Sequence, residues 1–261
     1  MQSSSAKKLA MTVEYEGTRY HGFQIQNGVN TIQGEIESAL MKVTGRRTNI
    51  VGAGRTDAGA HAKGQAISFK TSSTLSSQTL IRALNSHLPR DISIKSGIVV
   101  DNNFNARRDA LGREYRYTIL NSPTPSPLYR KYSYFVPIPL DIAAMNKACR
   151  FLVGKHDFAS FTIPLKESTV RTISRAKVSK KGSLVRFDIS ASSFLPHQVR
   201  RTIGLLLKTG LGKLKPETFR DMMEAKKPGL AVFAAPAWGL CLMRVNYPEQ
   251  KLNKGQIDEN L

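Results

Sequence analysis

A glycine-rich segment that also carries a charged pair is the part of this sequence best suited to chemistry. Residues 52–61 read Gly-Ala-Gly-Arg-Thr-Asp-Ala-Gly-Ala-His, so Arg55 and Asp57 lie among three glycines. Glycine permits positive φ angles and close backbone approach, and a large ligand can therefore sit against such a loop. A simpler reading is a tight turn in which Asp57 caps a helix or pairs with Arg55.

Two common kinds of site do not fit the sequence. The segment has no Lys-Ser/Thr pair after a second glycine, and its glycine spacing differs from G-x-G-x-x-G, which excludes the familiar phosphate loops. Cys149 and Cys241 are far apart and have no Cys or His neighbours at metal-ligand spacing. We therefore expect no zinc site and no disulfide framework, and a reducing cytoplasm is the default compartment.

The composition is strongly basic. The chain has 39 Lys and Arg residues against 19 Asp and Glu residues, which gives a net charge of +20. Each phosphate that a basic side chain neutralises releases condensed counterions, so this excess favours polyanions. Nucleic acid is the partner class that the charge indicates.

The first hundred residues predict strands interrupted by two helices. Apolar residues alternate with polar ones over 8–15, as in a half-buried strand, and the other strands are expected at 49–54, 65–70 and 91–100. One helix begins at an Asn30 cap and ends at Gly45, and Pro89 closes the other.

The second half repeats this scheme loosely. Strands are predicted at 113–120, 175–178, 184–190 and 240–245, and helices after an Asp141 cap, over 198–209 and from Pro216. The pattern predicts two similar α+β domains, 1–104 and 105–248, each with strands covered by two helices, and a polar tail at 249–261. No signal-peptide core and no apolar run of membrane-spanning length occurs, so we expect a cytoplasmic protein that does not associate with membranes.

Seven further segments accompany the glycine-rich loop in an order typical of one enzyme family. The G-R-T-D-A-G-x-H pattern of the loop resembles the signature of the TruA-type tRNA pseudouridine synthases. The other segments that resemble this family's motifs are Tyr15–Gln24, Leu88–Ile92 with Asn85, Phe104–Arg107, Arg113–Tyr117, Phe158–Phe161, Phe194–Arg200 and Ala235–Leu240. The resemblance spans some 240 residues.

This resemblance implies a fold, a reaction and partners. The implied fold has two α+β halves that share a continuous antiparallel sheet with helices packed on it, and a catalytic cleft between the halves. The implied reaction converts uridine to pseudouridine in the anticodon stem-loop of tRNA, around positions 38, 39 and 40. It uses no metal, nucleotide or redox cofactor. The implied assembly is a homodimer with the tRNA lying across both subunits.

The resemblance also assigns roles to residues at the centre of the reaction. Asp57 matches the essential aspartate, a nucleophile that must be ionised. Arg200 matches its cationic partner, although phosphate binding is an alternative and the neighbouring Arg201 competes for the assignment. Tyr115 matches the tyrosine that stacks on the target base, with Tyr117 as its competitor on the same strand face.

Further residues are expected around the substrate. Leu240 resembles the apolar residue that closes the pocket. Arg55 resembles the arginine that turns the base out and fills its space, with a structural pair to Asp57 as the alternative. Arg107 matches an RNA-backbone contact, or is a surface charge. His61 is expected to be structural or to contact RNA.

Two other functions remain open at this level. One is a non-catalytic RNA-binding module with the same fold, although a carboxylate such as Asp57 in an RNA-facing groove would repel phosphate. The other is the same isomerisation at another RNA site.

Overall fold

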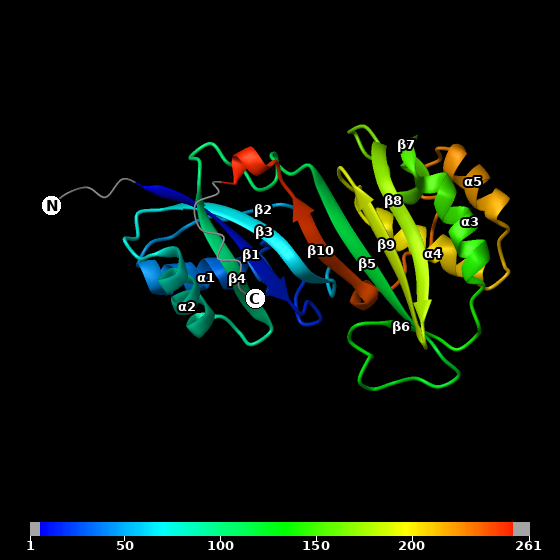
Figure 1. The fold of residues 1–261 in the computed structure, drawn as a ribbon, viewed down its shortest axis with the longest axis horizontal. Coiled ribbons are helices and arrows are strands. Elements are labelled where there is room, and N and C mark those ends of the chain that lie inside the picture. The colour runs from blue at the N-terminus through cyan, green and yellow to red at the C-terminus, as the bar shows by residue number, and fades with distance from the viewer. Residues whose placement is uncertain (1–5, 253–261) are drawn as a thin grey trace. The chain divides into compact units, whose positions relative to one another are not determined.

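The computed structural model describes residues 6–252, which form two compact units. Unit 1 contains the residues up to Leu111 together with those from Leu242 onward, and unit 2 contains Gly112–Cys241. Each unit has strands and helices (Figure 1), which confirms the predicted α+β class. In the part of the chain that the structure describes, no helix has the length and apolar character needed to cross a bilayer.

Unit 1 is built on strands whose apolar side chains alternate as the sequence predicted. Its strand order is β4–β1–β3–β10, and the two-residue strand β2 pairs with β3. The strands are β1 (Lys7–Tyr15), β2 (Val51–Gly52), β3 (His61–Thr71), β4 (Ile92–Val100) and β10 (Leu240–Asn246). β1 is antiparallel to both β3 and β4, with Leu9 opposite Phe69 and Met11 opposite Ile67. Because successive residues of a strand face opposite sides, these four buried side chains share one face.

Two capped helices belong to this unit and lie beside each other, α1 (Ile32–Thr44) and α2 (Ser77–His87) (Figure 1). The cap of α1 is Thr31, whose hydroxyl accepts the Gly34 N–H, so the cap lies one residue after the predicted Asn30. Gly45 ends α1 with a φ of 68°, a left-handed conformation that favours glycine.

The opposite face of this sheet has a second core that includes the last of the described residues. Ala10, Val100 and Phe104 are buried there, and Tyr247 and Leu252 pack against them. The Tyr247 hydroxyl donates to the Ala106 carbonyl at 2.6 Å, and its ring lies 5.2 Å from that of Phe104. The end of the described chain is therefore part of unit 1.

The division into units consequently differs from the expected domains 1–104 and 105–248. Residues 105–111 and those from Leu242 onward belong to unit 1, because they cover its second core. The predicted tail begins with a short 3₁₀ helix at Glu249–Lys251. The remainder of the tail, 253–261, lies outside the described residues.

Unit 2 has the strand order β5–β9–β8–β7. Its strands are β5 (Gly112–Asn121), β6 (Tyr134–Val136), β7 (Gly154–Asp157), β8 (Val170–Lys181) and β9 (Leu184–Ala191). The β5–β9, β8–β9 and β7–β8 pairs are antiparallel, whereas β6 runs parallel to β5. The prediction placed the strand before Gly182 at 175–178, but β8 is much longer than that.

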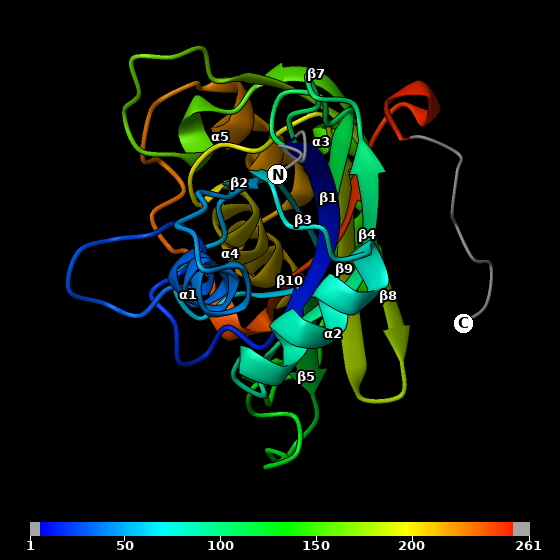
Figure 2. The same ribbon diagram turned by 90° about the vertical axis from the view of Figure 1, so that its left-hand side faces the viewer.

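Three helices belong to unit 2, each in a region where the sequence predicts a helix, although the pattern of two similar halves allowed only two. They are α3 (Ile142–Leu152), α4 (Gln198–Gly210) and α5 (Pro216–Glu224). The predicted cap of α3 is confirmed, since an Asp141 carboxylate oxygen accepts the Ala144 N–H at 2.9 Å. The three helices contact one another, α3 packs on β8, and Figures 1 and 2 show α4 on one side of β8 and β9.

Candidate active site

The glycine-rich segment forms the loop between β2 and β3 in unit 1. Arg55 is exposed and Asp57 is partly exposed, whereas Thr56 and Ala60 are buried. The loop thus leaves its charged residues accessible and is anchored by its buried residues.

The last residue of β1 and the backbone of the segment that follows it hold this loop. The Phe23 N–H donates to the Thr56 carbonyl at 3.2 Å, and the Gly59 N–H donates to the Tyr20 carbonyl at 3.2 Å. The hydroxyls of Tyr15 and Thr56 hydrogen-bond at 2.8 Å, and both side chains are buried. These contacts flank Asp57 on both sides and fix the backbone that carries it.

Two glycines allow the segment and the loop to lie this close. A Cβ atom on Gly17 would lie 1.9 Å from the Ala60 carbonyl oxygen. A Cβ atom on Gly22, whose φ is 91°, would lie 2.7 Å from the Thr56 carbonyl oxygen. Real Cβ atoms do not approach backbone oxygens so closely, so any side chain here would displace the loop.

His61, at the end of the loop, is also part of this support. Its ring is buried, and Nδ1 accepts the Gly17 N–H at 3.0 Å. The Glu16 carboxylate lies 4.0 Å from the same nitrogen. Because the Nδ1 lone pair is occupied by the backbone N–H, we interpret the contact with Glu16 as proximity and the role of His61 as structural.

Gln65 is a contact of the loop that sequence reasoning missed. This residue is fully buried, and its side-chain amide donates to the Gly54 carbonyl at 2.8 Å. Its Oε1 atom has no hydrogen-bond partner among the described residues. The only signal in the sequence was a polar residue at the start of the strand predicted at 65–70.

Asp91 anchors the supporting segment itself. Its carboxylate accepts from Arg19 Nε at 2.8 Å and from the Tyr20 hydroxyl at 2.6 Å, and its carbonyl accepts the Glu16 N–H at 2.9 Å. Burial raises the pKa of Tyr20, and its hydrogen bond to Asp91 acts in the same direction, so the phenol remains a donor. Hydrogen bonds thus connect two of the sequence motifs, 15–24 and 88–92, and together these motifs support the glycine-rich loop.

In unit 2, the two tyrosines of β5 share a face but differ in their surroundings. Tyr115 lies opposite Ile189, and its ring meets that of Phe194 edge-on at 5.2 Å and 89°. Tyr117 is fully buried, and its hydroxyl donates to the Pro236 carbonyl at 2.8 Å. Burial raises the pKa of Tyr117, so this hydroxyl is committed as a structural donor.

Arg200 lies on the first turns of α4 and is held by the segment before β10. Its Nε atom donates to the Ala235 carbonyl at 2.7 Å, and the Ala235 N–H donates back to the Arg200 carbonyl at 2.9 Å. The positive charge of Arg200 lowers the pKa of Tyr117, against the larger effect of burial, so the guanidinium is near that phenol. Arg201 instead donates to the Ala231 carbonyl at 3.2 Å.

The start of α4 has an unusual backbone. His197 precedes the helix with a φ of 59°, a left-handed conformation that is rare outside glycine. The fully buried Gln198 accepts the Leu195 N–H through Oε1 at 2.8 Å. Strained residues of this kind persist only where the surroundings determine them, and they cluster at functional sites.

Leu240 is the first residue of β10 and is 5% exposed, so it packs as a core residue would. Before it, Gly239 lies against Tyr117, since a Cβ atom there would be 2.6 Å from the ring. Arg107 is exposed on the loop after β4, where its N–H donates to the Asn105 side chain at 3.0 Å.

The candidate residues are therefore divided between the units. Arg55, Asp57 and Arg107 belong to unit 1, and Tyr115, Arg200 and Leu240 belong to unit 2. Within residues 6–252, no group of three or more His, Cys, Asp or Glu side chains is arranged to hold a metal ion.

Comparisons with known proteins agree on one family. The family model described as tRNA pseudouridine synthase matches residues 11–107 and 148–248. The chain is 41% identical over 246 residues to tRNA pseudouridine synthase A 2 of Clostridium perfringens, covering 92% of this chain and all of that protein. It is 39% identical to tRNA pseudouridine synthase A of Methylacidiphilum infernorum, covering 91% and 94% of the two chains. The same enzyme of Caldicellulosiruptor bescii is 40% identical, at 92% and 100% coverage.

Proposed function

Because this chain belongs to the tRNA pseudouridine synthase family, and is thus an isomerase, we propose that it acts on the anticodon stem-loop of tRNA with Asp57 as its nucleophile. The uridines converted are those around positions 38, 39 and 40. The proposal takes its site from the motif resemblance and its chemistry from the residues described above.

The observation that carries the proposal is the support around Asp57. The buried Tyr15–Thr56 hydrogen bond, the backbone contacts of Tyr20 and Phe23 and the Gln65 amide all fix the loop, while Asp57 itself stays partly exposed. A structural aspartate would not need so rigid a frame. A nucleophile does, because small misplacements of a reacting group are costly in rate.

The reaction is an isomerisation, so its atoms balance without an oxidant or reductant. The bond between N1 of uracil and C1′ of ribose breaks, and the uracil turns so that C5 faces C1′. The C5–C1′ bond then forms, C5 loses its hydrogen and N1 gains one. An ionised Asp57 assists by adding to C1′ or to C6 and leaving again.

Arg200 and Tyr115 are assigned to the substrate in this proposal. Arg200 supplies the cation that the motif resemblance assigns to this reaction. The Tyr115 ring stacks on the uracil once the base has left the helix. Tyr117 is fully buried, and its hydroxyl already donates to the Pro236 carbonyl, so we assign the stacking role to Tyr115 and not to Tyr117.

The remaining assignments concern access to the site. Arg55, exposed beside Asp57, takes the place of the extruded base, since a planar guanidinium can stack and donate hydrogen bonds at once. Leu240 closes the pocket with an apolar surface. Arg107 contacts the RNA backbone.

Replacement of Asp57 by asparagine tests the proposal. We expect Asp57→Asn to lower pseudouridine formation on an unmodified tRNA by at least about 10³-fold, because the amide is not a nucleophile, while tRNA binding persists. The measurement is pseudouridine mapping at single-nucleotide resolution with a parallel binding assay. Asp221→Asn, an exposed substitution on α5, is the matched control and should behave as wild type.

Each outcome of the mapping has a clear meaning. Conversion at positions 38–40 by the wild type and not by Asp57→Asn supports the site and the nucleophile. Conversion elsewhere would overturn the anticodon assignment, and an active Asp57→Asn would overturn the nucleophile.

A further inference from the structure

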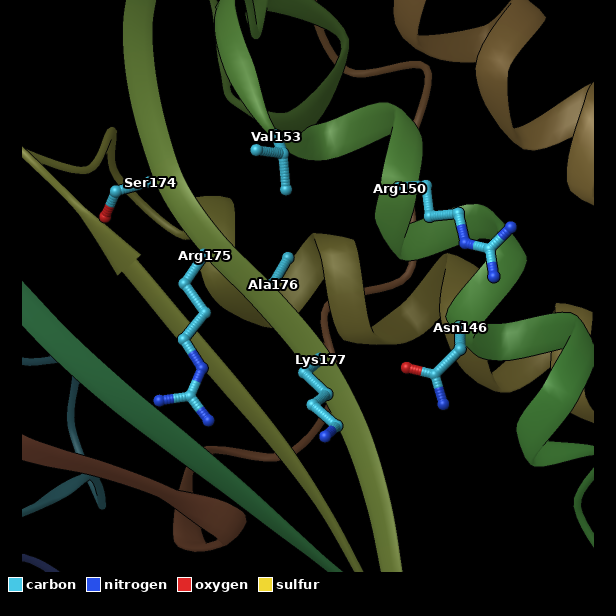
Figure 3. A pocket seen from close by; sticks show the side chains of 7 residues that line it. All are labelled: Asn146, Arg150, Val153, Ser174, Arg175, Ala176 and Lys177. Carbon is cyan, nitrogen blue, oxygen red and sulfur yellow. The ribbon is translucent and has the colours of Figure 1, made fainter.

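An open groove in unit 2 is lined by basic side chains that the proposed reaction does not use. It lies between α3 and β8, and we call it the α3–β8 groove. Its lining residues are Asn146 and Arg150 on α3, Val153 directly after that helix, and Ser174, Arg175, Ala176 and Lys177 on β8. Figure 3 shows these residues on the two elements, which form the opposite walls.

The groove exists because β8 is longer than the strand that covers its edge. β7 pairs only with the first four residues of β8, Val170–Ile173. Beyond them the edge of β8 faces α3. Asn146 bonds this edge twice, since its amide donates to the Val178 carbonyl at 2.9 Å and accepts the Val178 N–H at 2.9 Å. This double contact blocks strand addition at Val178 and fixes the two walls.

Among the described residues, the cations of the groove have no acidic partners. Arg150, Arg175 and Lys177 are exposed, and none of them forms an ion pair with a described residue. Asp188 lies opposite Lys177 in the β8–β9 register, but its carboxylate is held by Arg116 at 2.7 Å. The lining itself contains no carboxylate, so the groove carries three uncompensated positive charges.

The strand register places the Arg175 and Lys177 side chains on the face of the sheet away from Tyr115. Tyr115 is opposite Ile189, which is opposite Ala176, so these three side chains share one face. Arg175 and Lys177 extend from the other face, two strands away from β5. By the same alternation that face also carries the basic residues Lys155, Lys181, Arg186 and Arg116 and the acidic residues Glu114, Asp157 and Asp188.

We propose that the α3–β8 groove binds phosphate groups of the tRNA backbone outside the segment that enters the active site. This inference rests on the proposed function, because it takes tRNA as the substrate. The guanidinium groups of Arg150 and Arg175 can each grip a phosphate through two hydrogen bonds, and Lys177 adds a compact charge. The Ser174 hydroxyl at the same wall donates to the Ser190 carbonyl at 3.2 Å and is not counted among the phosphate donors.

The chemistry favours nucleic acid over an acidic protein segment. The groove offers three cationic side chains that can donate hydrogen bonds, and Val153 and Ala176 are the only apolar residues in its lining. Phosphate contacts position a nucleic acid without reading its sequence, and such a function needs no aromatic anchor or deep pocket.

The test removes the three charges together. We expect Arg150→Gln/Arg175→Gln/Lys177→Gln to weaken tRNA binding about tenfold or more at 0.1 M salt. The slope of log Kd against log salt should become smaller by about 2 to 3, one unit for each lost phosphate contact. The value of kcat/KM should fall with affinity, and kcat at saturating tRNA should fall far less.

The control variant carries the same charge change elsewhere in unit 2. Lys213→Gln/Lys215→Gln/Lys227→Gln alters three exposed lysines outside the groove and should keep the wild-type affinity and slope. In addition, Arg150→Lys/Arg175→Lys retains the charges and should keep most of the salt dependence. Circular dichroism checks that every variant is folded.

The outcomes separate this inference from the proposed function. If the groove variant kept the wild-type slope of log Kd against log salt, or if the lysine control lost as much tRNA affinity, the proposed phosphate binding by the groove would be wrong. Because binding requires no turnover, this result stands whether or not the wild type forms pseudouridine. A wild type that binds tRNA through the groove but converts no uridine would instead overturn the proposed reaction.

Discussion

At the scale of single residues, buried polar groups hold the candidate nucleophile in place. The Tyr15 and Thr56 hydroxyls pair inside unit 1, directly beside Asp57, and the Gln65 amide holds the carbonyl of Gly54. A buried hydroxyl that loses its partner costs about 1–3 kcal/mol. These bonds therefore stabilise the loop conformation as well as the fold.

We predict that Tyr15→Phe lowers kcat by about 10- to 100-fold with little change in KM. The ring still packs against Phe23, with centroids 6.4 Å apart, but Thr56 loses its partner and Asp57 its fixed position. The measurement is steady-state kinetics on tRNA together with a thermal melt.

Thr56→Val supplies the control for this prediction, because it removes the other half of the same bond. The double variant should be no slower than the worse single variant. Additive losses, or a fully active Tyr15→Phe, would show that the bond does not position Asp57.

At the scale of elements, two chain segments lie in contact because glycines remove the side chains between them. The segment after β1 lies against the loop before β3. Asp91, directly before β4, anchors the segment after β1. Gly22 has a positive φ and also touches the loop, whereas Gly28, a few residues later, has a φ of 77° with no atom within 4 Å of its added Cβ.

This pair of glycines gives a matched comparison. Both Gly22→Ala and Gly28→Ala incur the left-handed strain of about 1–2 kcal/mol, but only Gly22→Ala also meets the Thr56 carbonyl. We predict that Gly22→Ala abolishes activity and lowers the free energy of unfolding further than Gly28→Ala does. Denaturant unfolding and activity assays measure both effects. Equal behaviour of the two variants would disprove the role of close approach.

At the scale of the whole molecule, residues from both ends of the described chain belong to the same unit. The last described residues pack on the second core of unit 1, so two segments far apart in sequence complete one unit. The net charge of +20 belongs to the same scale, because a polyanion experiences the field of many side chains together.

We predict a homodimer at this scale, as the motif resemblance implies. The chain weighs 28.9 kDa, so light scattering coupled to size exclusion should report twice that mass, about 58 kDa. A mass of one chain at micromolar concentration, with full activity, would show that the enzyme works as a monomer.

The sequence by itself determined the fold class, the family and the candidate residues. Alternating apolar residues in 8–15 and the Asp141 cap are local signals, and they correctly predicted β1 and the start of α3. The ordered motifs indicated the family, because such patterns depend on residue type and spacing alone. The roles of Asp57, Arg55, Arg107, Tyr115, Arg200 and Leu240 stay predictions.

Tertiary structure decided what depends on contacts between distant segments. Local patterns cannot show that β10 completes unit 1, or that Gln65 bonds to Gly54, because the partner of an edge or an amide is set by packing. The open edge of β8 is likewise set by packing between distant segments. A strand's periodicity reveals which face it buries, but only the folded chain reveals what covers that face and which edge is left open.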